Sequence, residues 1–250
     1  MNYEIKATGG EKNAADSEKI LAAVREFSVT GKEPDPEMAA AAANQWELSP
    51  AFPKEASRAE LLKLICGKNV AEAMLKYRET MAALIPELRF SFDFEQRSKY
   101  HKYDVYEHTA RAVAAVPAEA EDAGILRLTM LLHDIGKPEM FRLGKDGFGH
   151  FKGHAKAGVP KAREILKRLG FGEDVIFRVC RLIAHHSDKI LCRDNICQLL
   201  EELGEHDFFL LLEVKKADNS AKHEFVLAEN DELDGFAATA RQILSAGGKK

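Results

Sequence analysis

The segment that most restricts the fold is "RLTMLLHDIGK", residues 127–137, in which a histidine and an aspartate follow an apolar stretch directly. The run of apolar residues is typical of a buried helix, and Gly136 is typical of a helix end. A buried carboxylate lowers the free energy of unfolding considerably unless it is paired with a positive charge or bound to a metal ion. Asp134 therefore predicts a fold in which other parts of the chain bring compensating groups to this point.

The rest of the chain shows helical periodicity joined by short loops, and we find no strand pattern of any length. Asp35 followed by Pro36 marks a helix start. Ser57 and Glu60 have the spacing of a capping box, and Gly67 marks a stop. We therefore predict an all-α protein. The predicted helices cover residues 16–27, 36–46, 57–67, 70–84, 105–116, 122–135, 155–169, 174–186, 195–203, 206–222 and 231–245.

Two irregular stretches interrupt this pattern. Residues 89–104 are rich in aromatic and charged side chains, and residues 141–154 contain four glycines. Loops of this length within a compact domain are often functional. We therefore expect both stretches to lie near a functional site.

The composition is that of an ordinary globular protein, with 46% hydrophobic and 30% charged residues in a chain of 250. No apolar run approaches the roughly 20 residues that span a bilayer. The start, "MNYEIKATGGEKN", has no apolar stretch like that of a signal peptide. We expect a cytoplasmic protein without membrane association. The four cysteines have neither CxxC nor zinc-finger spacing, and we expect them to be reduced.

The charge is unevenly distributed. The whole chain carries a formal net charge of −4, but residues 137–193 contain 13 lysines and arginines against 6 aspartates and glutamates, a local charge of +7. This segment is either a set of solvated helix faces or a positive rim for a ligand that bears phosphate. The sequence leaves both interpretations open.

Seven of the nine histidines lie between residues 101 and 186. His108 lies four residues before Ala112 and so borders the buried face of its predicted helix. Asp218 is either a surface carboxylate paired with Lys215 or Lys222, or a further ligand. Two imidazoles and two carboxylates suit a divalent cation such as Mn, Fe, Ni, Zn or Mg. The predicted ligand set is His108, His133, Asp134 and Asp218.

The segments "YEHT", "LLHDIGK" and "KKADNSAK" resemble the HD superfamily of metal-dependent phosphohydrolases. That family has a first histidine, an adjacent His-Asp pair and a distant aspartate, and these fall on the four residues of the predicted ligand set. The resemblance implies an all-α helical bundle that holds a divalent ion. It also implies that this ion neutralises the buried Asp134.

A closer resemblance extends over residues 17–225. "YHKYDVYEHTARAV", "GFGHFKGHAKAG" and "IAHHSD" resemble the HD-containing C-terminal half of bacterial CCA-adding enzymes, the tRNA nucleotidyltransferase/poly(A) polymerase family. Upstream, "EKILAAVREFSVTGKEPDPEM" resembles the neck helices of that family. The resemblance implies a helical neck over residues 1–88 and an HD domain over residues 89–250. The 16 residues before Ser17 are too few for the catalytic head, so we expect no nucleotide addition by this chain alone.

Asp134 and Lys137 are the predicted catalytic residues. The family shares the lysine in the form HDxGK, and a lysine at this place can reach a non-bridging phosphate oxygen as a point charge. The alternative is a solvated lysine at the C-terminal end of a helix, where the helix dipole favours it.

A second ion is a further implication of the resemblance. Some HD proteins hold it with one histidine from a Gly-His element and another from a His-His element, and the aspartate of the HD pair bridges both ions. We therefore expect His154 and His185 as additional ligands. The less certain candidates are His186, as the alternative to His185, and His150.

These motifs favour a metal-dependent phosphohydrolase that acts on a nucleotide or on the 3′-end phosphate of an RNA. The alternative is a tRNA-binding neck and body whose metal site is structural or vestigial. A third interpretation is an all-α scaffold in which the histidines have no common role. The substrate itself is not readable from the sequence.

Overall fold

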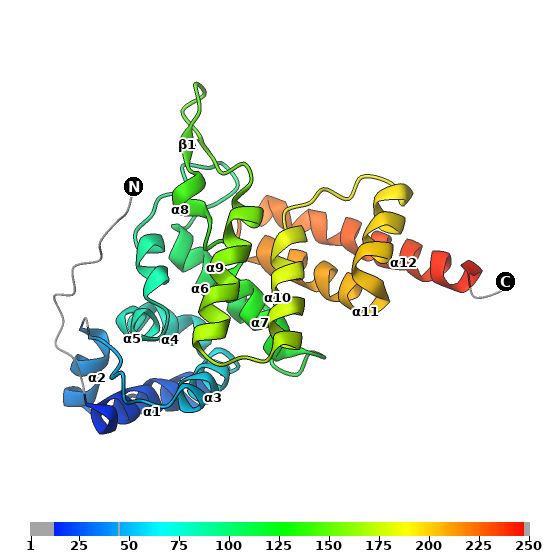
Figure 1. Ribbon diagram of the computed structural model, residues 1–250. Helices are drawn as coiled ribbons and strands as arrows, with labels where there is room; N and C mark the ends of the chain where they lie inside the picture. The colour runs from blue at the N-terminus through cyan, green and yellow to red at the C-terminus, as the bar shows by residue number, and fades with distance from the viewer. Residues whose placement is uncertain (1–12, 45, 248–250) are drawn as a thin grey trace.

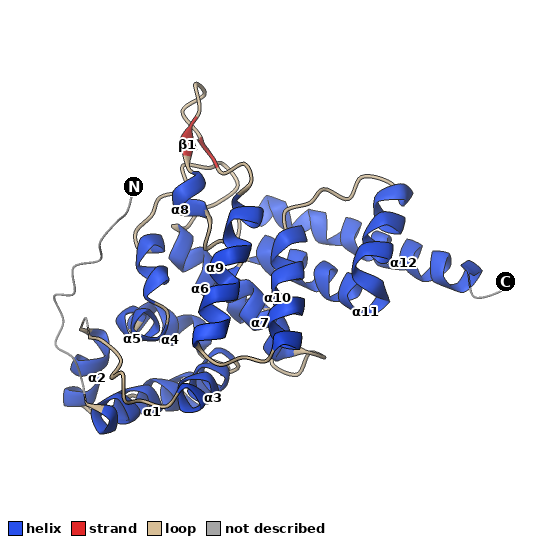
Figure 2. Ribbon diagram, in the orientation of Figure 1, coloured by secondary structure: helices blue, strands red, loops and turns tan. Residues whose placement is uncertain are grey.

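The computed structural model describes residues 13–44 and 46–247. These residues form twelve α-helices, two short 3₁₀ helices and one small β-hairpin (Figure 2). The prediction of an all-α protein is therefore confirmed. Residues 1–12 of the predicted neck, Gln45 in the predicted helix 36–46 and residues 248–250 lie outside the described residues. Within the described ranges, no helix is both long and apolar enough to cross a membrane.

Five helices form the part of the molecule in which the described chain begins. Two of them start at side-chain caps: the carboxylate of Asp35 accepts a hydrogen bond from the backbone N–H of Met38, as the sequence predicts, and Asn13 caps the first helix in the same way. α1 packs against α2, α3 and α4. The five helices are α1 Ala14–Thr30, α2 Pro36–Ala43, α3 Lys54–Ile65, α4 Val70–Lys76 and α5 Arg78–Leu84.

The remaining helices form a second bundle, and a hairpin projects from it (Figure 1). α6 packs on α7 and α11, whereas α10 packs on α7 and α9. The elements are η1 Pro86–Ser91, α6 Val105–Ala115, α7 Ala123–Leu132, α8 Lys137–Met140, β1 Arg142–Leu143, β2 Gly149–His150, α9 His154–Arg168, α10 Glu173–His185, α11 Arg193–Ser220, η2 Glu224–Ala228 and α12 Glu229–Gly247.

Helix α7 is the centre of this bundle. Every residue from 125 to 132 is buried, and a helix that is apolar on all sides must be covered on all sides. α3, α6, α10 and α11 provide that cover. The His133–Asp134 pair follows the last turn of α7 and therefore lies inside the bundle.

Three local predictions are corrected by the structure. Ser57 lies inside α3, which begins at Lys54, and so it does not cap the start of the helix. Its hydroxyl donates to the carbonyl oxygen of Pro53 at 3.2 Å. The predicted helix 70–84 is interrupted at Tyr77, whose backbone leaves the helical region. The antiparallel pairing of β1 with β2 adds a hairpin where no strand was predicted. By contrast, the predicted break between the helices 195–203 and 206–222 is confirmed, because the backbone of Gly204 leaves the helical region inside α11.

The buried residues on both sides of residue 88 belong to one continuous hydrophobic cluster. The buried guanidinium of Arg127 on α7 joins the two parts further. It donates to the carbonyl oxygens of Ile65 and Gly67 at 2.5 and 3.0 Å, and to that of Val116 at 2.6 and 3.1 Å. The division into a neck and an HD domain at residues 88 and 89 stays a prediction.

Replacing Arg127 by methionine tests this connection. Arg127→Met leaves three buried carbonyl oxygens without their donor, and each unsatisfied group costs roughly 1–3 kcal/mol. We expect the free energy of unfolding, measured by urea denaturation, to fall by about 3 kcal/mol or more. The matched control is Arg111→Met, because Arg111 lies on the surface and pairs with Glu107. That change should cost less than about 1 kcal/mol, and equal losses for the two variants would contradict the assignment.

Candidate metal centre

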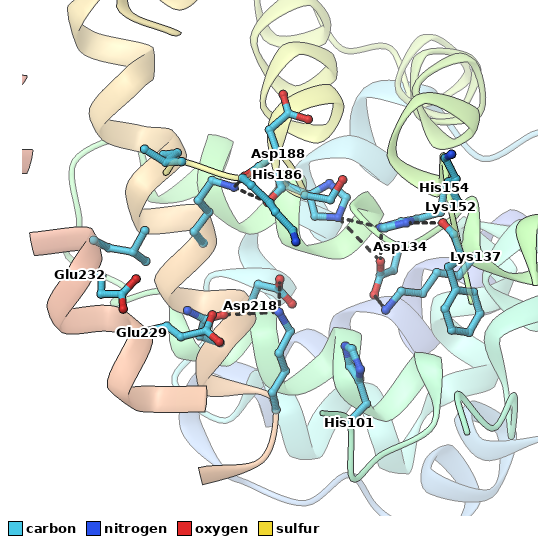
Figure 3. A pocket seen from close by; sticks show the side chains of 18 of the residues that line it. His101, Asp134, Lys137, Lys152, His154, His186, Asp188, Asp218, Glu229 and Glu232 are labelled. Carbon is cyan, nitrogen blue, oxygen red and sulfur yellow. Dashed lines mark hydrogen bonds and ion pairs between the residues drawn. The ribbon is translucent and has the colours of Figure 1, made fainter. Parts of the chain in front are cut away.

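The four residues of the predicted ligand set lie together inside the bundle (Figure 3 shows Asp134 and Asp218). His108 comes from α6, His133 caps the end of α7, Asp134 follows it, and Asp218 comes from α11. The Nε2 atom of His108 lies 3.2 Å from Nε2 of His133, 3.1 Å from Oδ1 of Asp218 and 3.4 Å from Oδ2 of Asp134. Three separate helices thus bring these side chains to one point.

A second group shares Asp134. His154 is the first residue of α9 and His186 caps the end of α10. The Nε2 atoms of these two histidines lie 3.0 Å apart. Oδ1 of Asp134 lies 3.3 Å from Nε2 of His154 and 3.8 Å from Nε2 of His186. The two groups, His108–His133–Asp134 and Asp134–His154–His186, each have the proximity that a metal ion requires. Asp134 turns one carboxylate oxygen toward each.

Two histidines named from the sequence lie elsewhere. The ring of His185 bonds Asp188 through Nδ1 at 2.8 Å and lies 3.7 Å from Glu202. His150 is exposed on β2, with its Nε2 atom 3.3 Å from Asp146. Successive residues of a helix point about 100° apart, so that only one histidine of the His-His pair can face the centre. The geometry places His186 there, whereas the sequence ranked His185 first.

All four histidines of the centre are held in the same way. Each ring contacts a backbone carbonyl oxygen through Nδ1, at 3.1 Å for His108, 2.6 Å for His133, 2.9 Å for His154 and 2.7 Å for His186. A carbonyl only accepts hydrogen bonds, so Nδ1 of each ring carries a hydrogen and Nε2 is the atom turned toward the centre. The two Nε2 atoms of each histidine pair therefore face each other, at 3.2 Å for His108 and His133 and at 3.0 Å for His154 and His186. Fixing a histidine through its other nitrogen is typical of metal ligands.

The carboxylate of Asp134 is the least satisfied group of the centre. Its Oδ2 atom is buried and makes no hydrogen bond of acceptable geometry, although Nζ of Lys137 lies 2.7 Å away. Burial raises the pKa of Asp134, but the neighbouring His133 and Lys137 more than offset this and hold the pKa well below its usual range. An ionised, buried and incompletely bonded carboxylate between two imidazole pairs is a donor set that fits a divalent cation.

Lys137 is buried rather than solvated. It begins α8 instead of ending a helix, and its Nζ atom donates to Oε1 of Gln96 at 2.7 Å. The ring of Phe151 lies beneath the ammonium group, with its centroid 5.3 Å from Nζ. The solvated-lysine interpretation therefore does not describe this residue.

Asp218 makes the ion pair with Lys222 that the sequence offered as one interpretation, and its other oxygen faces the centre. Its Oδ1 atom faces His108, and its Oδ2 atom accepts from Nζ of Lys222 at 2.8 Å. Burial raises the pKa of Asp218, but Lys222 and His108 hold it well below its usual range. Lys222 thus neutralises this carboxylate from the outer side while the inner oxygen faces the centre.

Sequence reasoning did not single out two neighbours of the centre, Gln96 and His101. The ring of His101 packs edge-on against that of His108, with centroids 5.1 Å apart. Burial and the charge of Lys137 lower the pKa of His101 to about 2, so this ring is neutral. Both residues come from the irregular stretch 89–104, whose composition was the available signal.

The centre opens into a cavity of about 660 Å³. Asp134, Lys137, His154 and His186 line one side of it, and residues of α11 and α12 line the other (Figure 3). Small-molecule sites in proteins typically have volumes of about 300–1,000 Å³. The cavity is therefore large enough for a ligand with an organic part beside its reacting group.

Comparison with known proteins identifies relatives of this chain. It is 33% identical over 137 residues to an A-adding tRNA nucleotidyltransferase from Deinococcus radiodurans, covering 53% of this chain and 31% of that protein. It is 31% identical over 147 residues to a CC-adding tRNA nucleotidyltransferase from Thermus thermophilus, covering 55% and 32%. A bifunctional uridylyltransferase/uridylyl-removing enzyme from Caulobacter vibrioides is 30% identical over 152 residues, covering 53% and 15%.

These matches confirm the resemblance to tRNA nucleotidyltransferases, although the aligned region spans only about a third of the length of the two tRNA enzymes. Residues 100–222 match the family of HD domains. This range contains both candidate ligand groups. It also contains the ion pair between Asp218 and Lys222. The part of the chain that holds the centre thus matches HD domains.

Proposed function

We propose that this protein is a metal-dependent phosphohydrolase. In this proposal His108, His133, Asp134 and Asp218 hold one divalent ion, and Asp134, His154 and His186 hold a second. The observation that carries the proposal is the buried Oδ2 atom of Asp134, which lacks a well-formed hydrogen bond although imidazole nitrogens surround it. The identity of the ion, among Mn, Fe, Ni, Zn and Mg, is left open by a mixed nitrogen and oxygen donor set.

A divalent ion bound here would lower the pKa of a bound water to about 7 and offset negative charge on a phosphoryl oxygen. The protein side chains bind and orient the substrate. Gln96 and Phe151 hold Lys137 with its ammonium group beside Asp134, at the wall of the cavity. From there Lys137 donates to a non-bridging oxygen of the substrate and keeps the phosphate oriented.

The substrate class follows from the charges around the cavity. We infer a phosphate ester of a nucleotide or of an RNA end, since three lysines of the basic segment 137–193, namely Lys137, Lys152 and Lys189, line the cavity. The names of the relatives support this inference, because they refer to tRNA nucleotidyl transfer and to uridylyl removal. A cytoplasmic location, in which nucleotides and tRNA are available, is part of the same proposal.

Binding of tRNA is the second candidate function. The projecting hairpin favours it, because the aromatic ring of Phe148 is 44% exposed there and the same hairpin carries the basic Arg142 and Lys145. Exposed aromatic side chains among basic residues are typical of surfaces that bind single-stranded nucleic acid. Steep salt dependence of tRNA binding, without any metal-dependent hydrolysis, would favour this function over the first.

The choice between His186 and His185 tests the second ion. We expect the purified protein to contain two divalent ions and His186→Ala to lose one of them, because this change removes an Nε2 ligand. His185→Ala is the matched control and should retain both ions, since its ring bonds Asp188 away from the centre. Metal content measured by mass spectrometry after dialysis, with circular dichroism to confirm folding, gives the answer. Loss of an ion only in His185→Ala would reverse the assignment.

The role of Lys137 tests the catalytic proposal. The wild-type protein should hydrolyse phosphate esters with added Mn²⁺ and not with a chelator. Lys137→Gln should keep its metal ions but lower kcat by about 10²–10³, the typical effect of losing one donor to transition-state charge. Lys161→Gln is the control, because Lys161 pairs with Glu139 on the surface. Full turnover in metal-loaded Lys137→Gln would remove Lys137 from the mechanism.

A further inference from the structure

Helix α12 forms the wall of the cavity opposite the metal centre. It lies outside the range that matches the HD family, which ends at residue 222. Glu229, Glu232, Leu233 and Phe236 line the cavity. Their spacing of three, four and seven residues from the first places them on one face of the helix. In Figure 3 the two glutamates lie across the cavity from His154 and Lys152.

The two ends of the cavity differ in chemistry. The end with the metal centre has Lys137 and Lys152, whose ammonium groups suit a phosphate group, beside the proposed metal ligands. The α12 end has two carboxylates, which repel a phosphate and accept hydrogen bonds from hydroxyl and amino groups. Leu233 and Phe236 add an apolar surface between them. A ligand with a phosphate at one end and a planar apolar group with several donors at the other fits both ends.

The other lysines around the cavity do not change this difference in charge between its two ends. Nζ of Lys215 donates to the backbone carbonyl oxygens of His186 and Asp188 at 2.8 and 2.6 Å. Lys222 is paired with Asp218. Lys189 lies on the loop between α10 and α11 and not on α12. Among the described residues that line the cavity, α12 itself contributes no positive charge.

We propose that α12 binds the nucleoside part of the substrate and that the substrate is a mononucleotide rather than the end of an RNA chain. The proposal rests on the proposed phosphohydrolase function of the same site. A base has a flat face that can pack on the ring of Phe236, and the ribose hydroxyls and base amino groups can donate to Glu229 and Glu232. The next phosphodiester of an RNA chain would lie against these carboxylates, which repel it.

Three substrates test the proposal on the full chain with Mn²⁺. These are adenosine monophosphate (the 2′, 3′ and 5′ isomers), glycerol 2-phosphate, which has no base, and a 3′-phosphorylated hexa-adenylate. We expect kcat/KM to be highest for one of the mononucleotides. Phe236→Ala should lower that value about tenfold, a loss typical of a base–aromatic contact, through KM rather than kcat. Its effect on glycerol 2-phosphate should be small.

Control variants distinguish a specific effect of the α12 residues on substrate binding from a general loss of folding or activity. Phe225→Ala removes a ring that is 60% exposed and does not line the cavity, and it should leave all rates unchanged. The double change Glu229→Lys and Glu232→Lys should raise kcat/KM for the oligonucleotide, because the repulsion becomes attraction. Equal rates of the wild type on the oligonucleotide and the mononucleotide would overturn the proposal. So would an equal loss on glycerol 2-phosphate in Phe236→Ala.

Calorimetric titration with adenosine monophosphate separates nucleoside binding by α12 from hydrolysis at the metal centre. If no phosphate ester is hydrolysed, the proposed function fails. We would still expect adenosine monophosphate to bind at α12, and Phe236→Ala to weaken this binding about tenfold. Absence of binding by the wild type, or equal binding by Phe236→Ala and the wild type, would overturn the assignment of α12.

Discussion

The architecture of this protein depends on one buried carboxylate. Asp134 follows a helix that is buried on all sides, so the chain cannot expose it without exposing α7 as well. A buried charge persists only if other groups compensate it. Lys137 from the start of α8 supplies a positive charge. His108 from α6, His154 from α9 and His186 from α10 bring ring nitrogens to the carboxylate, and in our proposal these share divalent ions with it. Residues at or near the ends of four helices thus meet at this carboxylate.

The positions of the histidines follow from helix ends rather than from side-chain contacts alone. His133 and His186 each cap a helix and contact the carbonyl oxygen three residues earlier, Met130 and Ile183 respectively. Carbonyl oxygens in the last turn of a helix lack an intrahelical partner, so a histidine at the helix end can donate a hydrogen bond to one of them from Nδ1. The same hydrogen bond points Nε2 away from the helix. Local backbone chemistry thus fixes both the tautomer and the direction of the ring.

The sequence predicted what depends on periodicity and local chemistry. It placed most helices and the cap at Asp35, and it named the four residues that α6, α7 and α11 bring together. It was wrong where tertiary packing overrides local signals, as at Ser57 inside α3 and at Tyr77, which is buried and interrupts a helix. The choice between His185 and His186 depended on a rotation of 100° that no motif encodes. Gln96 and His101 reach the centre from an irregular stretch without periodicity.

The central claim is that divalent ions occupy both sides of Asp134. Anomalous X-ray diffraction from crystals grown with Mn²⁺ tests it most directly, because the signal locates the metal without reference to activity. The account predicts two anomalous peaks, one among His108, His133, Asp134 and Asp218 and the other among Asp134, His154 and His186. Crystals with saturating Mn²⁺ but no peak beside Asp134, and with Lys137 as its only close partner, would contradict the account.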